Sequence, residues 1–147
     1  MILTEHVLAH KTLFMIIVIV HVIVVHGGDG LDELTTTTMS QAWELRDGAV
    51  RAYEIDPTSF GLPVATAGQL VGGPPALNAE LARRVVHGER GPHRDIVVLN
   101  AGAGLYTAGA ASSIADGIEL AGAVIDDGRA AAALERLVTV SNRVKAS

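Results

Sequence analysis

The chain has 147 residues, of which 49% are hydrophobic and 3% aromatic, and its formal net charge at pH 7 is -5. This length suits one domain with a sizeable core, and the apolar content excludes a disordered chain. The negative charge and the scattered basic residues give no footprint for nucleic acid, and a sequence without cysteine excludes disulfide or thiolate chemistry. We therefore expect a single α/β domain located in the cytoplasm.

The first feature along the chain is an apolar run over residues 13–25, in which His21 is the only polar residue. A transmembrane helix needs about 20 apolar residues, so the run is short for a membrane span. A secretory signal peptide would need a basic start and a small-residue cleavage site, which the sequence does not match. The density of isoleucine and valine favours a fully buried strand, with His21 in the core or on a strand face. A membrane or signal role is the alternative.

A glycine-rich acidic loop follows over residues 26–35. Its three glycines let the backbone turn tightly and approach a ligand closely. The adjacent carboxylates of Asp32 and Glu33 form a candidate Mg²⁺ site beside a phosphorylated substrate. The alternative is that Asp29 and Asp32 are turn and N-cap residues. His26 either donates a hydrogen bond to a ligand or is satisfied by neighbouring backbone.

The next elements are two short strands, predicted over residues 43–45 and 50–55. Asp47-Gly48 between them is a strong hairpin signal. Residues 56–63 read as a loop, because two prolines and a glycine oppose regular structure.

Helices are expected in the second half of the chain. A proline-initiated helix is predicted over 76–87 and ends at Gly88. Residues 95–100 are either a buried strand or the apolar start of a helix, because periodicity does not separate the two. The small residues at 101–111 favour close helix packing. The overlapping segment Asn100–Gly104 does not meet the G-x-G-x-x-G spacing of a dinucleotide loop.

Two more helices complete the prediction. Ser112 or Ser113 is the N-cap of one that ends at 126–128, and the last covers about 129–140. Strands followed by helices make an incomplete-looking α/β unit. Four arginines either meet phosphates or stay solvated: Arg83, Arg84, Arg90 and Arg94.

The order of short motifs resembles anthranilate phosphoribosyltransferase from about Val22 to Leu137. The acidic loop carries the clearest likeness, and the fold implied is an α/β domain of the nucleoside phosphorylase/phosphoribosyltransferase type. Residues 20–147 would be the C-terminal part of a glycosyl transferase family 3 α/β domain, after an atypical segment 1–19. The collinear motifs are Val24–Glu33, Ile55-Asp56-Pro57, Phe60-Gly61-Leu62, Leu70–Gly73, Gly88–Pro92, Arg94–Gly102 and Ile125–Gly128.

The resemblance implies transfer of phosphoribose from phosphoribosyl pyrophosphate to the amine of anthranilate, in tryptophan biosynthesis. It assigns Mg²⁺ to Asp32 and Glu33 and no catalytic side chain. It also implies a homodimer for the full-length enzyme, without nucleic-acid or membrane partners.

The family's Gly-Thr-Gly-Gly-Asp loop, which cradles the pyrophosphate, and its anthranilate contacts lie upstream of the acidic loop and have no counterpart in this sequence. The expectation is therefore a C-terminal third that is inactive alone. Three alternatives stay open: a non-catalytic module that pairs with a separate chain carrying the missing half, a related nucleoside phosphorylase fragment, and a membrane-associated protein anchored by residues 13–25.

Overall fold

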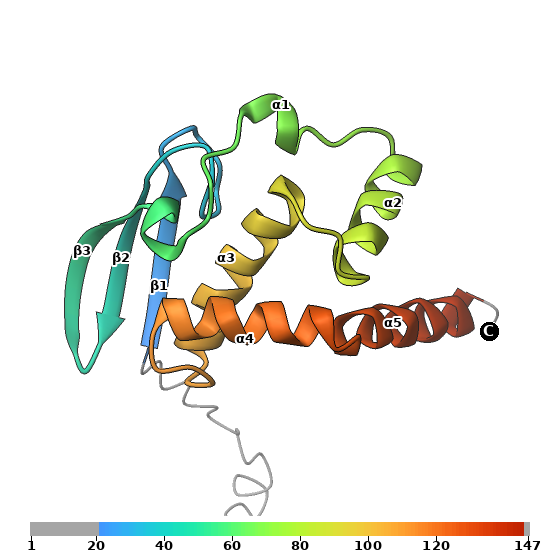
Figure 1. The fold of residues 1–147 in the computed structure, drawn as a ribbon. Helices are drawn as coiled ribbons and strands as arrows, with labels where there is room; N and C mark the ends of the chain where they lie inside the picture. Colours follow the sequence, from blue (N-terminus) through green and yellow to red (C-terminus); the bar gives the residue numbers. More distant parts are fainter. Residues whose placement is uncertain (1–20, 146–147) are drawn as a thin grey trace, which may run out of the picture.

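The computed structural model describes residues 21–145, in which three strands are followed by helices, as the sequence predicts. Residues 13–20 of the apolar run lie outside the described part. Figure 1 shows the sheet beside α3, with α4 and α5 following one another nearly end to end. The elements are β1 (His21–Gly27), β2 (Ser40–Arg46), β3 (Ala49–Ile55), a 3-10 turn (Pro57–Phe60), α1 (Ala67–Leu70), α2 (Pro75–Val86), α3 (Pro92–Thr107), α4 (Ile114–Asp126) and α5 (Arg129–Lys145).

The sheet is antiparallel, with the order β1-β2-β3. Gly27 pairs with Ser40 at one end of β1, where the acidic loop connects the strands. The predicted hairpin between β2 and β3 is confirmed, and Asp47 and Gly48 turn it with φ of 51° and 75°. Positive φ at both central positions is what a twisted two-residue hairpin requires, and glycine and aspartate tolerate it.

The strand β1 is half-buried, so the expectation of a fully buried strand is wrong for residues 21–25, the described part of the apolar run. Its Val24 is 58% exposed and lies beside Trp43 of β2, which is 42% exposed. The reason is that helices cover one face of the sheet only (Figure 1). Alternate residues of each strand point to opposite faces, so Val24 and Trp43 share the open outer face.

Residues 95–100 belong to the helix α3, which settles the choice between strand and helix. Pro92 occupies its first turn, where a missing N–H costs no hydrogen bond. Val98 and Leu99 are buried on its inner side. Asn100–Gly104 therefore lies inside a helix and forms no dinucleotide loop.

The helices α3 and α4 touch through their backbones, as the run of small residues predicts. A Cβ atom on Gly117 of α4 would collide with the carbonyl group of Gly102 on α3. Ser113 is the N-cap of α4, because its hydroxyl accepts a hydrogen bond from the Asp116 N–H. The last helix, α5, reaches residue 145 and is longer than the predicted 129–140.

Two clusters of buried side chains form the core. The first joins the sheet to α3 and α4, and the second joins α2 to α3 and α4. Within residues 21–145, no helix has the length and apolar character needed to cross a bilayer. The clusters are Leu34, Ala42, Ile55, Leu99, Ala103 and Ile114, and Val85, Val98, Ala121 and Ile125.

Candidate functional site

In the structure the acidic loop extends over residues 28–39, the whole connection between β1 and β2, and it is folded on itself at the end of the sheet. The Gly27 N–H donates to the Leu31 carbonyl at 2.8 Å, and the Gly28 N–H donates to the Met39 carbonyl at 2.9 Å. A Cβ atom on Gly28 would lie 2.7 Å from the Met39 oxygen, so only glycine permits this approach. The predicted tight turn is confirmed.

Asp29 is the turn residue that the sequence offered as an alternative. One carboxylate oxygen accepts hydrogen bonds from the hydroxyls of Thr35 and Thr37, at 2.7 and 2.5 Å. The other accepts from the Leu31 N–H at 3.2 Å. Although loss of solvation opposes ionisation, the hydrogen bonds from Thr37 and Thr35 hold the pKa of Asp29 below its ordinary value. Asp29 therefore shapes the loop through its bonds to Thr35, Thr37 and Leu31.

The C-terminal half of the loop is anchored to the rest of the protein. The Leu34 side chain is 1% exposed and lies in the first core cluster. Its backbone N–H and carbonyl both bind the side-chain amide of Asn100 on α3. The Thr36 carbonyl accepts from the Ala65 N–H at 2.9 Å. These bonds fix the chain on the C-terminal side of Glu33.

The two predicted metal ligands, Asp32 and Glu33, are both exposed, and neither carboxylate bonds to another described residue. Glu33 lines a groove of about 370 Å³, whereas Asp32 lies outside its lining. The groove passes between the loop, α1 and α3. Its other lining residues are Asp29, Leu31, Thr37, Ala67, Leu70, Val71, His93 and Ile96.

The donor chemistry of Asp32 and Glu33 fits Mg²⁺, which prefers oxygen ligands and is bound by one or two carboxylates together with waters and substrate phosphates. Within residues 21–145 no group of three or more His, Asp or Glu side chains is placed to hold a metal ion. A complete protein cage is therefore not built here, but the two-carboxylate arrangement that accompanies a phosphorylated substrate is available.

His26 lies at the loop end of β1, opposite Gln41 of β2. Its side chain is exposed and makes no hydrogen bond to a described residue. The interpretation that neighbouring backbone satisfies it is therefore wrong.

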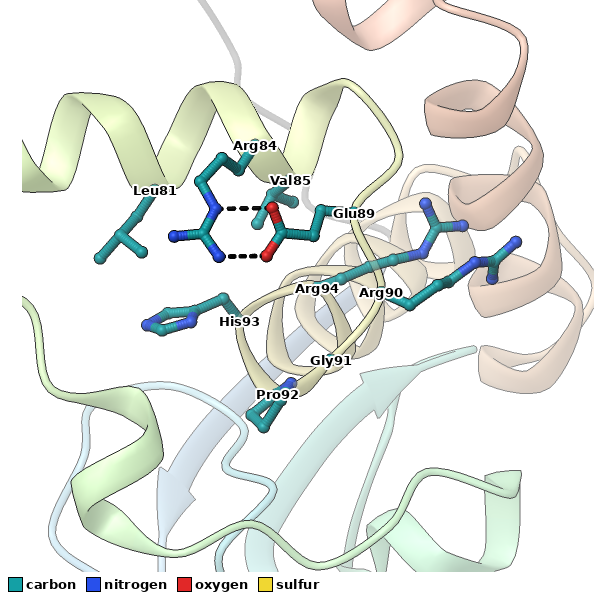
Figure 2. Close-up of a pocket in the computed structure, with 9 residues that line it drawn as sticks. All are labelled: Leu81, Arg84, Val85, Glu89, Arg90, Gly91, Pro92, His93 and Arg94. Atoms are coloured by element: carbon teal, nitrogen blue, oxygen red, sulfur yellow. Dashed lines mark hydrogen bonds and ion pairs between the residues drawn. The ribbon is translucent and has the colours of Figure 1, made fainter.

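A smaller hollow of about 160 Å³ lies between α2 and the start of α3, and arginines line it (Figure 2). Arg84 binds both carboxylate oxygens of Glu89. Arg90 contacts Asp126 of α4 at 2.9 Å, and Arg94 contacts the same carboxylate at 2.8 Å. These three arginines are engaged in ion pairs with carboxylates of the same chain.

Arg94 corrects the prediction of a solvated or phosphate-binding charge, because its side chain is 3% exposed. Its guanidinium also donates to the Gly122 carbonyl at 3.3 Å. A buried cation needs a charged partner, which Asp126 of α4 supplies, although the buried Nη1 of Arg94 has no hydrogen-bond partner among the described residues. Arg83, by contrast, is exposed on α2, as predicted.

A second carboxylate cluster lies toward the hairpin end of the sheet, away from the acidic loop. Glu44 is 9% exposed and accepts hydrogen bonds from Tyr106 at 2.8 Å and from His21 at 2.7 Å. Burial opposes its ionisation, but bonds from Tyr106, His21 and Tyr53 and the charge of His21 hold the pKa of Glu44 below its ordinary value. Glu44 in turn adds to burial in raising the pKa of Tyr53 to about 12. The expectation that His21 lies on a strand face is confirmed.

Sequence reasoning missed two parts of the groove wall and one residue that supports the acidic loop. Residues 67–70 were not predicted as a helix, yet α1 forms one wall. No motif in the sequence pointed to His93, which lines the groove, and Asn100 was predicted only as part of a glycine-rich segment. The hydroxyl-rich run at 35–38 was the available signal for the bonds to Asp29.

The sequence matches the α/β domain of a glycosyl transferase family over residues 2–131, and the chain belongs to this family. The anthranilate phosphoribosyltransferase of Maricaulis maris (strain MCS10) is 52% identical over 122 residues, which are 83% of this chain and 36% of that protein. The family match over residues 2–131 includes most of segment 1–19. That this segment is distinct from the rest of the domain stays a prediction.

Solved structures of the same enzyme share the fold. The enzyme from Thermus thermophilus superimposes with a TM-score of 0.73 at 42% identity, over 81% of this chain and 35% of that one. The enzyme from Saccharomyces cerevisiae, in complex with phosphoribosyl pyrophosphate and Mg, gives a TM-score of 0.67 at 23% identity, over 77% and 33%. The latter likeness concerns the fold alone.

The chain thus spans about a third of the length of the relatives that it matches. The predicted family and fold class, the α/β domain of the nucleoside phosphorylase/phosphoribosyltransferase type, are confirmed. The relatives named above are anthranilate phosphoribosyltransferases, and they do not favour the alternatives of a nucleoside phosphorylase fragment or a non-catalytic module.

Proposed function

We propose that this chain is part of an anthranilate phosphoribosyltransferase and contributes the Mg²⁺-binding half of its active site. The whole enzyme would transfer phosphoribose from phosphoribosyl pyrophosphate to the amine of anthranilate. The observation that carries the proposal is the pair of unbonded carboxylates, Asp32 and Glu33, on a loop whose backbone and neighbouring side chains are hydrogen-bonded. The 52% identity to the Maricaulis maris enzyme supports the choice of reaction.

In this proposal Asp32 and Glu33 would hold the metal ion, and a metal bound there would supply positive charge beside the departing pyrophosphate. Asp29 and its two threonine partners keep the loop folded, so the carboxylates are positioned before the substrate arrives. Because the amine of anthranilate is already nucleophilic, the described residues need not include a strong base.

The proposal also concerns what the chain does alone. Its residues correspond to 36% of the Maricaulis maris enzyme. The arginines around the smaller hollow are already paired with Glu89 and Asp126, so we do not assign them to the pyrophosphate. We expect additional polypeptide to cradle the pyrophosphate and bind anthranilate, and we expect no turnover from the 147 residues by themselves.

Manganese, which replaces Mg²⁺ at oxygen sites and is visible by electron paramagnetic resonance, tests the metal assignment. The double variant Asp32→Asn with Glu33→Gln should bind Mn²⁺ at least about tenfold more weakly than the wild type, because it loses both charged ligands. The control is Asp47→Asn, since Asp47 is an exposed carboxylate in the hairpin turn. Equal binding by the double variant and the wild type would refute the metal assignment.

Activity is tested by the loss of anthranilate fluorescence after phosphoribosyl pyrophosphate and Mg²⁺ are added. The isolated chain should leave the fluorescence unchanged. Robust turnover would contradict the expectation that further polypeptide is needed.

A further inference from the structure

The side chain of Asn100 connects the helix α3 to the acidic loop. His93, Ile96 and Asn100 follow one another at helical spacing, so they share one face of α3. His93 and Ile96 line the groove together with Glu33. Asn100 lies one turn further along and reaches the loop backbone instead.

The Asn100 amide binds both polar groups of one loop residue. Its Oδ1 accepts from the Leu34 N–H at 2.9 Å, and its Nδ2 donates to the Leu34 carbonyl at 2.7 Å. Nδ2 also donates to the Ile96 carbonyl at 3.0 Å. The opposite orientation of the amide would place Oδ1 against two carbonyl oxygens, so the three bonds define one orientation.

Leu34 directly follows Glu33, so the position of its backbone determines where the two carboxylates lie. The Leu34 side chain is buried, and water has little access to its backbone groups. Loss of the amide would leave a buried N–H and carbonyl without partners, at a cost large enough to favour rearrangement of the backbone. The loop would then move to find new partners.

We infer that Asn100 is a positioning residue for the metal site, and that it holds the backbone on which Asp32 and Glu33 are presented. This inference rests on the proposed function. Several side chains of the loop and of β2 bond to the loop backbone. Among the other residues of the range 21–145, only Asn100 has a side chain that does so. It would act on the metal ligands through the Leu34 backbone, to which its side chain is bonded.

The test compares Asn100→Leu with Val98→Ala, each examined by Mn²⁺ binding and by amide hydrogen exchange. Asn100→Leu should weaken Mn²⁺ binding at least about tenfold, as expected when an indirect support of a metal ligand is removed. It should also speed exchange at the Leu34 amide. Val98 belongs to the second core cluster, so its truncation lowers stability while Mn²⁺ affinity stays within about twofold.

A second variant covers the case in which Asn100→Leu does not fold. Asn100→Asp keeps an acceptor for the Leu34 N–H, but its carboxylate loses both donated bonds and faces the Leu34 and Ile96 carbonyl oxygens, so its Mn²⁺ affinity should also fall at least about tenfold. The third measurement is hydrogen exchange of the wild type with and without metal. If an ordered loop favours metal binding, then bound metal must favour the ordered loop. Saturating Mg²⁺ should slow exchange at the Leu34 amide and leave the Val98 amide unchanged.

The outcomes separate the two claims. If the wild type shows no Mn²⁺ binding that depends on Asp32 and Glu33, the proposed metal site fails and the inference fails with it. If that binding is present but unaffected by the Asn100 variants, or if Mg²⁺ leaves Leu34 exchange unchanged, the inference alone is overturned.

Discussion

The two ends of the sheet carry carboxylates in opposite environments. At the acidic loop, Asp32 and Glu33 are exposed and unbonded to other described residues. Toward the hairpin end, Glu44 is buried and receives hydrogen bonds from Tyr106 and His21. A buried charge persists only when it is paired, whereas a solvated one can stay free for a ligand. The difference separates a carboxylate that supports the fold from carboxylates available for binding.

The largest expected difference in stability is between two variants that each remove one carboxylate charge, one at each end of the sheet. Glu44→Gln should lower the free energy of unfolding by about 2 kcal/mol, because it disrupts bonds to a charged, buried acceptor. Glu33→Gln should change it by less than about 0.5 kcal/mol, as is usual for exposed positions. Urea denaturation measures both, and equal losses would remove the distinction between the two ends.

Acid should act mainly on the buried end. The pKa of Glu44 is held below its ordinary value of 4.5, so the folded state binds protons less readily than the unfolded state does. The stability that Glu44 contributes is therefore present above about pH 4.5 and is lost as the pH falls through its lower folded-state pKa. Urea midpoints measured between about pH 6 and 3 should fall more steeply for the wild type than for Glu44→Gln. If the urea midpoints of the two proteins fell in parallel, carboxylates other than Glu44 would be responsible for the loss of stability at acid pH (the acid limb).

A smaller effect is expected from Tyr106→Phe. The substitution removes the hydrogen bond to Glu44 and the one accepted from Arg46 at 2.7 Å. It keeps the edge-to-face contact with His21, whose ring centroid lies 4.8 Å away. Stability should fall by about 1 kcal/mol, and the acid limb should move to higher pH because Glu44 loses a donor. An unchanged acid limb would show that Tyr106 does not support the ionised carboxylate.

The smallest effect on stability is expected from Asp29→Asn in the loop. The hydroxyls of Thr35 and Thr37 can rotate to accept hydrogen bonds from the new amide, so the loss should stay below about 0.5 kcal/mol. Urea denaturation checks this value, with Glu44→Gln measured alongside. A loss of stability equal to that of Glu44→Gln would show that Asp29, like Glu44, supports the fold through its charge.

Turn-forming and helix-starting residues in the sequence predicted those elements whose ends are determined by neighbouring residues. The hairpin follows from Asp47-Gly48, and the start of α2 follows from Pro75. Residues 95–100 stayed undecided because a short apolar run fits both a strand and a helix. Arg94 was misjudged because the partner that buries it, Asp126, lies in a different helix.

The candidate site was predictable to a similar extent. Glycines next to acidic residues pointed to Asp32 and Glu33, and the structure leaves both carboxylates unbonded to described residues. Asn100 was not predictable in this role, since it bonds the backbone of a residue 66 positions away. A contact between a side chain and a distant peptide group leaves no periodic pattern in the sequence. The position of His93 in the groove was also not predictable, because only the tertiary fold brings it there.

The open face of the sheet gives the chain an optical reporter. Trp43 is the only tryptophan in the sequence and is 42% exposed on that face, beside Val24. An indole in contact with water emits at longer wavelength than one enclosed by apolar groups. Any polypeptide that covers the outer face should therefore shift the intrinsic fluorescence to the blue. Metal binding at the acidic loop should leave the emission colour unchanged, so the two events can be followed separately in one cuvette.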